Sequence, residues 1–231
     1  DFTNLASIDQ TGLLADNFAL GLGGYQPIGL ALDLVDAVPA SASPAVLAEV
    51  PGYLGSAYDM LDGDNAAQDR VVAYSSRKLT PVLSTIGYDA KAGEGSQVPV
   101  LRSALISTLG DMGDKAVVAE ANRRFAALDS DPTALDGPLR NVWLGIIAKN
   151  ADQATWDKLR AMAKGAKTDL EKSTLYALLG GARDEKLAAQ ALDLALTDEP
   201  GKTTSAAIIG QVGYAHPMQA VDFVLAHRAQ Y

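Results

Sequence analysis

Four arginines, Arg102, Arg123, Arg124 and Arg140, are the side chains of this sequence best suited to hold a ligand. A guanidinium group is a planar fork of N–H donors that can bind a carboxylate through two parallel hydrogen bonds. On a hollow surface formed by helices, such groups would bind the carboxylate of a ligand. We predict Arg102 and Arg140 as ligand-binding residues. The simpler alternative for each arginine is an ion pair at the surface or between helices.

The sequence offers no constellation for catalysis or metal binding. It has two histidines, His216 and His227, and no cysteine, so a thiolate or histidine-rich metal site is not available. The zinc-peptidase pattern, two histidines and a glutamate on one helix face, is absent. His216 precedes Pro217 near a helix start, and His227 falls in a final helical turn, so we interpret both as structural. No catalytic residue and no metal ligand is predicted.

Composition restricts the fold and the class of partner. Of the 231 residues, 48 % are hydrophobic but only 6 % are aromatic, a mixture rich in alanine and leucine that predicts an all-α protein. The net charge of −9 argues against a nucleic-acid partner. No apolar segment is long enough to cross a bilayer, so no membrane partner is expected. Because the first residue is Asp1 rather than methionine, we expect a fragment of a larger protein or a processed chain, and the cellular compartment stays open.

The segment Val98–Leu128 has the clearest internal order. Apolar residues recur every three or four positions on both sides of the turn at 110–114, which places them along one face of each of two helices. Gly113 suits the position after a helix end, where a left-handed backbone is needed. Asp114 can accept hydrogen bonds from the free N–H groups of the next helix. The segment is therefore predicted to form an antiparallel helical hairpin.

Helical pairs open again downstream, near Pro138, Thr168 and Thr203. Their spacing of roughly 30 to 40 residues is typical of helical-hairpin repeats. Each hairpin leaves an apolar face uncovered, so neighbours are expected to stack into a curved α-solenoid of antiparallel helix pairs, of the HEAT or armadillo kind. An irregular globular bundle of helices is the alternative.

Two further patterns concern the ends of elements and of domains. The segments Ser7–Gln10 and Thr168–Glu171 each fit a capping box, in which the first side chain caps a helix and the last reaches back. We predict a single helical-repeat domain over residues 1–231. If the chain divides, the glycine-containing loop at 88–97 is the expected boundary.

The order of several short motifs along the chain resembles a known family. The motifs are Leu101-Arg102, Leu109-Gly110, Gly113-Asp114, Arg124-Phe125, Trp156 with Leu159, and Glu171-Lys172. In this order, and over nearly the whole chain from Leu13 to Leu225, the sequence resembles the C-terminal helical domain of the M1 zinc aminopeptidases. The puromycin-sensitive and endoplasmic-reticulum aminopeptidases and their bacterial relatives are members of that family.

The resemblance implies a HEAT-like bowl that closes over the active site of a larger enzyme and encloses its peptide substrate. The partner would be the catalytic domain of the same polypeptide, which would bind zinc and recognise a free N-terminus through a Gly-x-Met-Glu-Asn motif; that motif does not occur here. The implied function is that of the substrate-enclosing domain of a zinc-dependent aminopeptidase, with neither cofactor nor catalysis in this chain alone. Arg102 and Arg140 would then contact the peptide. A free-standing helical-repeat scaffold that binds a protein or peptide partner is the alternative.

Overall fold

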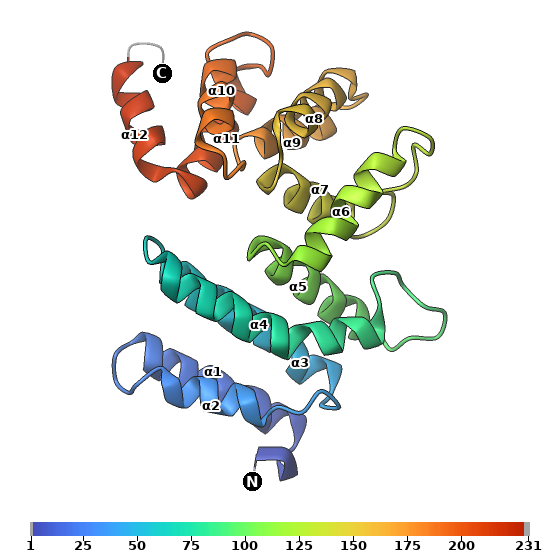
Figure 1. Ribbon diagram of the computed structural model, residues 1–231, viewed down its shortest axis with the longest axis vertical. Helices are drawn as coiled ribbons and strands as arrows, with labels where there is room; N and C mark the ends of the chain where they lie inside the picture. Colours follow the sequence, from blue (N-terminus) through green and yellow to red (C-terminus); the bar gives the residue numbers. More distant parts are fainter. Residues whose placement is uncertain (1, 229–231) are drawn as a thin grey trace. The chain divides into compact units, whose positions relative to one another are not determined.

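The computed structural model describes residues 2–228, and all regular structure in this part of the chain is helical (Figure 1). It divides into two compact units, Asp1–Val117 and Val118–Tyr231. The loop at 88–97 lies inside the first unit. The predicted all-α class is confirmed, whereas a curved solenoid over the whole chain stays a prediction. No helix in the described residues combines the length and the apolar character that a membrane span requires.

The first unit begins with a short 3₁₀ turn and contains five complete helices. These elements are η1 (Phe2–Asn4), α1 (Ser7–Leu22), α2 (Gly29–Ala37), α3 (Pro44–Asp59), α4 (Asn65–Ile86) and α5 (Val98–Asp111). Helix α3 is central, because it packs against α1, α4 and α5. The ring of Phe18 in α1 stacks on that of Tyr53 in α3, with centroids 4.2 Å apart. Apolar residues of α5 complete this core, with Leu101, Leu105 and Leu109 fully buried.

The turn after α5 has the conformation that its sequence predicts. Gly113 adopts a φ of 76°, in the left-handed region that glycine tolerates. The Asp114 carboxylate then accepts hydrogen bonds from the backbone N–H groups of Ala116 (3.0 Å) and Val117 (3.2 Å). Helix α6 (Lys115–Ala127) therefore starts on an aspartate cap, and it runs from the first unit into the second.

The second unit contains six further helices in the part of it that the structure describes, up to residue 228. They are α7 (Arg140–Lys149), α8 (Gln153–Gly165), α9 (Asp169–Leu179), α10 (Glu185–Ala195), α11 (Lys202–Ala215) and α12 (Pro217–Ala226). Consecutive helices pack as neighbours at α8–α9, α10–α11 and α11–α12, and α9 also packs on both α7 and α11. Contact between alternate helices is what stacked hairpins produce, so within this unit the packing resembles a helical repeat.

The helix caps test the local predictions directly. Thr168 accepts a hydrogen bond from the N–H of Glu171, so the Thr168 cap is confirmed, whereas the Glu171 side chain binds Arg140 rather than completing a capping box. The prediction for Ser7 was wrong: the N-cap is Ala6, and Ser7 is already helical. The reason lies in the preceding 3₁₀ turn, whose Phe2 carbonyl accepts a hydrogen bond from the buried side chain of Gln10. Gln10 is therefore not available to complete a capping box.

Candidate functional site

Arg102, the first predicted ligand-binding residue, is buried in the first unit, with 2 % of its surface exposed. Its Nη1 donates to Glu94 Oε1 at 2.9 Å and its Nη2 to Glu94 Oε2, which makes a two-bonded pair. Its Nε donates to the Gly87 carbonyl at 2.9 Å. In the structure the guanidinium thus binds a carboxylate, but one that belongs to this chain. A contact with a ligand stays a prediction.

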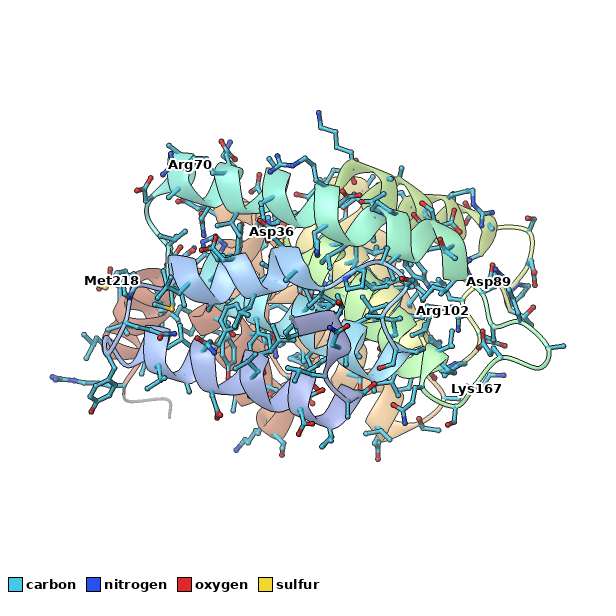
Figure 2. All side chains as sticks on the ribbon, turned by 90° about the horizontal axis from the view of Figure 1, so that it is seen from below. Asp36, Arg70, Asp89, Arg102, Lys167 and Met218 are labelled. Atoms are coloured by element: carbon cyan, nitrogen blue, oxygen red, sulfur yellow. The ribbon has the colours of Figure 1, made fainter. Side chains whose placement is uncertain are left out.

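The position of Arg102 follows from how α4 ends. Gly87, with a φ of 77°, stops the helix and turns the chain into the loop at 88–97. Arg102 and Lys91 donate to the carbonyls of Gly87 and Thr85 at this end, where carbonyl groups lack partners within the helix. Figure 2 shows Arg102 beside the loop that carries Asp89. The hydrogen bonds from Arg102 hold the pKa of the Glu94 carboxyl below its usual range.

Arg140, the second predicted residue, lies in the second unit at the first position of α7. Its Nη2 donates to Glu171 Oε1 of α9 at 2.9 Å. The two side chains are 30 % and 36 % exposed, so this pair is open to solvent. Because the pair is open to solvent, replacing the Glu171 carboxylate with the carboxylate of a ligand would cost Arg140 little free energy. The same exchange at the buried Arg102 would cost much more.

The other two arginines, Arg123 and Arg124, both bind Glu120 on the same helix. The Nε atoms of the two arginines each lie 2.7 Å from a Glu120 oxygen. The Arg124 guanidinium also lies 4.9 Å from the ring centroid of Trp143. These contacts lower the pKa of the Glu120 carboxyl, with the hydrogen bond from Arg123 as the largest cause. Glu120 and the two arginines therefore form a network of ion pairs along one helix, in which Arg123 is exposed and Arg124 is largely covered.

The two histidines contact backbone carbonyl groups. His216 caps α12, and its Nε2 lies 2.9 Å from the Ala182 carbonyl. The Nδ1 of His227 lies 2.8 Å from the carbonyl of Phe223, and the two rings are 4.5 Å apart. Within residues 2–228, no three histidine, aspartate or glutamate side chains come together in a group that could hold a metal ion.

A second cluster, centred on Glu199, is not indicated by any pattern in the sequence. Arg160 of α8 donates to both Glu199 oxygens, from Nε at 2.8 Å and from Nη2 at 2.7 Å. Lys164, one turn later, lies 3.1 Å from the same carboxylate, and the Tyr176 hydroxyl of α9 donates to it at 3.2 Å. Glu199 sits in the loop between α10 and α11, so donors from two helices meet on one loop carboxylate. Arg160 and Glu199 are 39 positions apart, which no local pattern could reveal.

The electrostatics of this cluster follow from its donors. Hydrogen bonding to Arg160, the largest cause, lowers the pKa of the Glu199 carboxyl to about 2. Burial, reinforced by the negative charge of Glu199, raises the pKa of the Tyr176 hydroxyl to about 12. At neutral pH the tyrosine therefore stays a hydrogen-bond donor and the glutamate an ionised acceptor. The arrangement fastens a loop, and neither group is prepared to transfer a proton near pH 7.

Comparison with known proteins gives these features a family context. Residues 2–230 match the family described as the ERAP1-like C-terminal domain. The chain is 27 % identical over 221 residues to Aminopeptidase M1-A of Oryza sativa subsp. japonica, an alignment that covers 91 % of this chain and 25 % of that protein. It is 23 % identical over 205 residues to Aminopeptidase M1 of Arabidopsis thaliana, covering 85 % of this chain and 23 % of that protein.

The chain therefore spans about a quarter of the length of the curated relatives that it matches. The match to the domain family, in contrast, covers all of the described residues. Helices alone make up the regular structure of those residues, as the resemblance in sequence predicted. The chain belongs to the family of ERAP1-like C-terminal domains.

Proposed function

We propose that this chain is the substrate-enclosing C-terminal domain of an M1 aminopeptidase that removes N-terminal residues from peptides. The observation that carries the proposal is the match to the ERAP1-like C-terminal domain over residues 2–230. The aminopeptidases among its relatives are about four times as long as the part that aligns, so the reaction would belong to another part of the polypeptide. That part would hold the zinc ion and would be the partner of this chain.

The helices of this chain would form part of the surface around the bound peptide and would not supply catalytic side chains. Clamped loops and packed helices form a surface of fixed shape, which can hold a peptide, keep bulk water away and exclude substrates that are too large. The two histidines contact backbone carbonyls, and the chain has no cysteine. We propose that the chain by itself hydrolyses no peptide.

Within this function, Arg140 is the better of the two predicted peptide contacts. Its pair with Glu171 is open to solvent, and exposed pairs contribute little free energy, so a peptide carboxylate can compete with Glu171 at small cost. Arg102 binds Glu94 in the interior, and a ligand would first have to displace a buried pair and the loop that carries it. We therefore propose the peptide contact for Arg140 and a positioning role for Arg102.

The test uses the full-length protein, assayed on an aminoacyl-p-nitroanilide and on a series of peptides of increasing length. We expect hydrolysis that a zinc chelator abolishes, and a cut-off in rate for the longest peptides. An Arg140→Ala variant should raise KM for the longer peptides about fivefold and leave turnover of the nitroanilide unchanged. The exposed Lys167→Gln, in the loop before α9, is the matched control.

The outcomes separate the two parts of the proposal. A full-length protein that releases no N-terminal residue from any of these substrates would contradict the aminopeptidase function. An Arg140→Ala variant with an unchanged KM for every peptide would contradict only the contact assigned to this arginine. Turnover by the 231-residue chain alone, above the background without protein, would show that a reaction centre lies within it.

A further inference from the structure

A cavity of about 190 Å³ lies in the first unit, between the end of α2 and the helices α3, α4 and α5. Its lining is mostly aliphatic, with Leu47 and Val50 from α3, Leu79 and Val82 from α4, and Leu105 from α5. These five side chains are all buried. An apolar cavity of this size can hold a group as large as a benzene ring, since a dry cavity of about 150 Å³ is known to do so.

The charged residues at this cavity come from one turn of α4, where Arg77 and Lys78 join the lining. Lys78 Nζ donates to the carbonyls of Asp36 and Val38, at 3.1 and 2.7 Å, and so ties the end of α2 to α4. The Asp36 carboxylate accepts a hydrogen bond from the Tyr74 hydroxyl at 2.7 Å. Lys78 and Asp36 are thus both engaged in fastening α2.

Arg77 differs from Lys78 in that no hydrogen bond to the end of α2 engages it, although Asp36 lies nearby on the other side of Tyr74. It is exposed, and its guanidinium carbon lies 5.9 Å from the centroid of the Tyr74 ring. Among residues 2–228, no carboxylate forms an ion pair with it. Arg77 therefore places a positive charge beside an apolar cavity, an arrangement that complements an anion with an apolar tail.

We propose that this cavity binds a small free carboxylic acid, with a phenyl-sized apolar tail between α3, α4 and α5 and its carboxylate on Arg77. The tail is limited by the cavity volume, which is below the range of about 300–1,000 Å³ usual for drug-sized ligands. The carboxylate would receive the forked N–H donors of Arg77. The inference depends on the first unit alone and is independent of the proposed aminopeptidase function.

The test is an NMR titration of the 231-residue chain with 3-phenylpropionate. We expect saturable shifts of the backbone amides of Val38, Leu47 and Val82, which line the cavity. The matched neutral alcohol, 3-phenylpropanol, should bind about fivefold more weakly, because it lacks the charge that Arg77 binds. Acetate, which has the charge without the tail, should give no saturable shift at these amides.

Three variants test the assignment of the residues. Arg77→Gln should weaken binding of 3-phenylpropionate about fivefold and remove the preference over the alcohol. Arg70→Gln is the control, since Arg70 is exposed on the same helix and does not line the cavity. Figure 2 shows it apart from Asp36, which lies at the end of α2 that borders the cavity. Ala40→Phe, at an exposed lining position, should close the mouth without altering the core and weaken binding more than tenfold.

Several results would overturn the proposal. Absence of saturable shifts at the lining amides would exclude a ligand of this kind in the cavity. Equal affinity for the acid and the alcohol would remove the role of the carboxylate. A loss of affinity in Arg70→Gln as large as in Arg77→Gln would show a general charge effect. Unchanged binding by a folded Ala40→Phe protein would place the ligand elsewhere.

Discussion

A guanidinium–carboxylate pair fastens a loop in each unit, the loop at 88–97 in the first and the loop at 196–201 in the second, but the two pairs differ in their surroundings. In the first unit, Arg102 is 2 % exposed and Glu94 15 %, and the arginine also binds the carbonyls at the end of α4. In the second unit, Arg160 is 35 % exposed and Glu199 22 %, and the shared centre is the carboxylate. In the first pair, the arginine also satisfies carbonyl groups at the end of α4. The second pair joins the loop after α10 to α8.

Burial of the arginine, 2 % exposed in the first pair and 35 % in the second, is the main difference between the two pairs. Both have two hydrogen bonds between the same chemical groups at similar distances. Removing Arg102 would empty a buried position and leave the partly buried Glu94 carboxylate and the carbonyls at the end of α4 without these donors, which costs more than the pair itself contributes. Removing one donor from Glu199 would leave two others and access to water. The same pairing of side chains is therefore expected to contribute unequally to the stability of the two units.

The largest effect should come from Arg102→Ala. We expect it to lower the free energy of unfolding by about 3 kcal/mol, because it empties a buried position and removes the donor to the Gly87 carbonyl. Urea unfolding followed by circular dichroism measures this. Arg123→Ala, at a side chain that is 65 % exposed, is the matched control and should change the value by less than about 0.5 kcal/mol. Equal effects of the two variants would contradict the distinction drawn from burial.

A second substitution tests how much close packing of helices stabilises the second unit, for comparison with the Arg102–Glu94 pair in the first. A Cβ atom added at Gly180 would lie 2.5 Å from the Ile208 carbonyl oxygen of α11. Gly180→Ala must therefore push α9 and α11 apart, and we expect a loss of about 1–3 kcal/mol in unfolding free energy.

The matched control for this substitution is Gly145→Ala. Gly145 lies inside α7, with no atom within 4 Å of an added Cβ. It should stabilise the protein by about 0.5–1 kcal/mol through helix propensity. Thermal unfolding of the two variants side by side decides the matter: a destabilised Gly145→Ala, or a Gly180→Ala as stable as the wild type, would contradict this description of the packing.

The smallest effect should come from Glu199→Gln, which keeps the shape of the side chain and one acceptor for Arg160. We expect a loss of about 1 kcal/mol at pH 7, discounted for solvent access to the pair. The pKa of Glu199 is lowered from 4.5 to about 2 on folding, so its ionised form stabilises the protein. That contribution is complete above about pH 4.5 and is lost as the pH falls towards 2.

Acid unfolding measures this dependence on pH. The difference in unfolding free energy between wild type and Glu199→Gln should shrink progressively from pH 5 to pH 2.5. Other carboxyl groups, such as those of Glu94 and Glu120, also have lowered pKa values, and subtracting the variant curve removes their common contribution. A difference that stays constant over this range would show that Glu199 does not titrate with the pKa that its contacts imply.

The elements that the sequence predicted well depend on residues close together in the chain. Gly113 and Asp114 determine a turn through contacts within three positions, and Thr168 caps its helix in the same way. The regular spacing of apolar residues likewise predicted the helices and the buried side of α5. Where an extra local element intervened, as the 3₁₀ turn did before Ser7, the local pattern was not enough.

The parts that could not be predicted are contacts between distant side chains. Arg160 and Glu199 meet only because α8 and the loop after α10 come together, and no periodicity relates their positions. Arg102 was singled out for its chemistry, but its burial and its partner Glu94 depend on how the loop at 88–97 folds back. Side-chain chemistry thus identified arginines that bind carboxylates. It could not say whose carboxylate each one binds.

Four helices begin at an aspartate, and these aspartates contribute to the net negative charge of the chain. The side chains of Asp64, Asp114, Asp152 and Asp184 each accept hydrogen bonds from the N–H groups that open a helix. Some of the negative charges of this chain therefore serve to cap helices. A redesign that turned the surface basic could exchange many carboxylates freely, but replacing these four with lysine would unravel the first turns of α4, α6, α8 and α10.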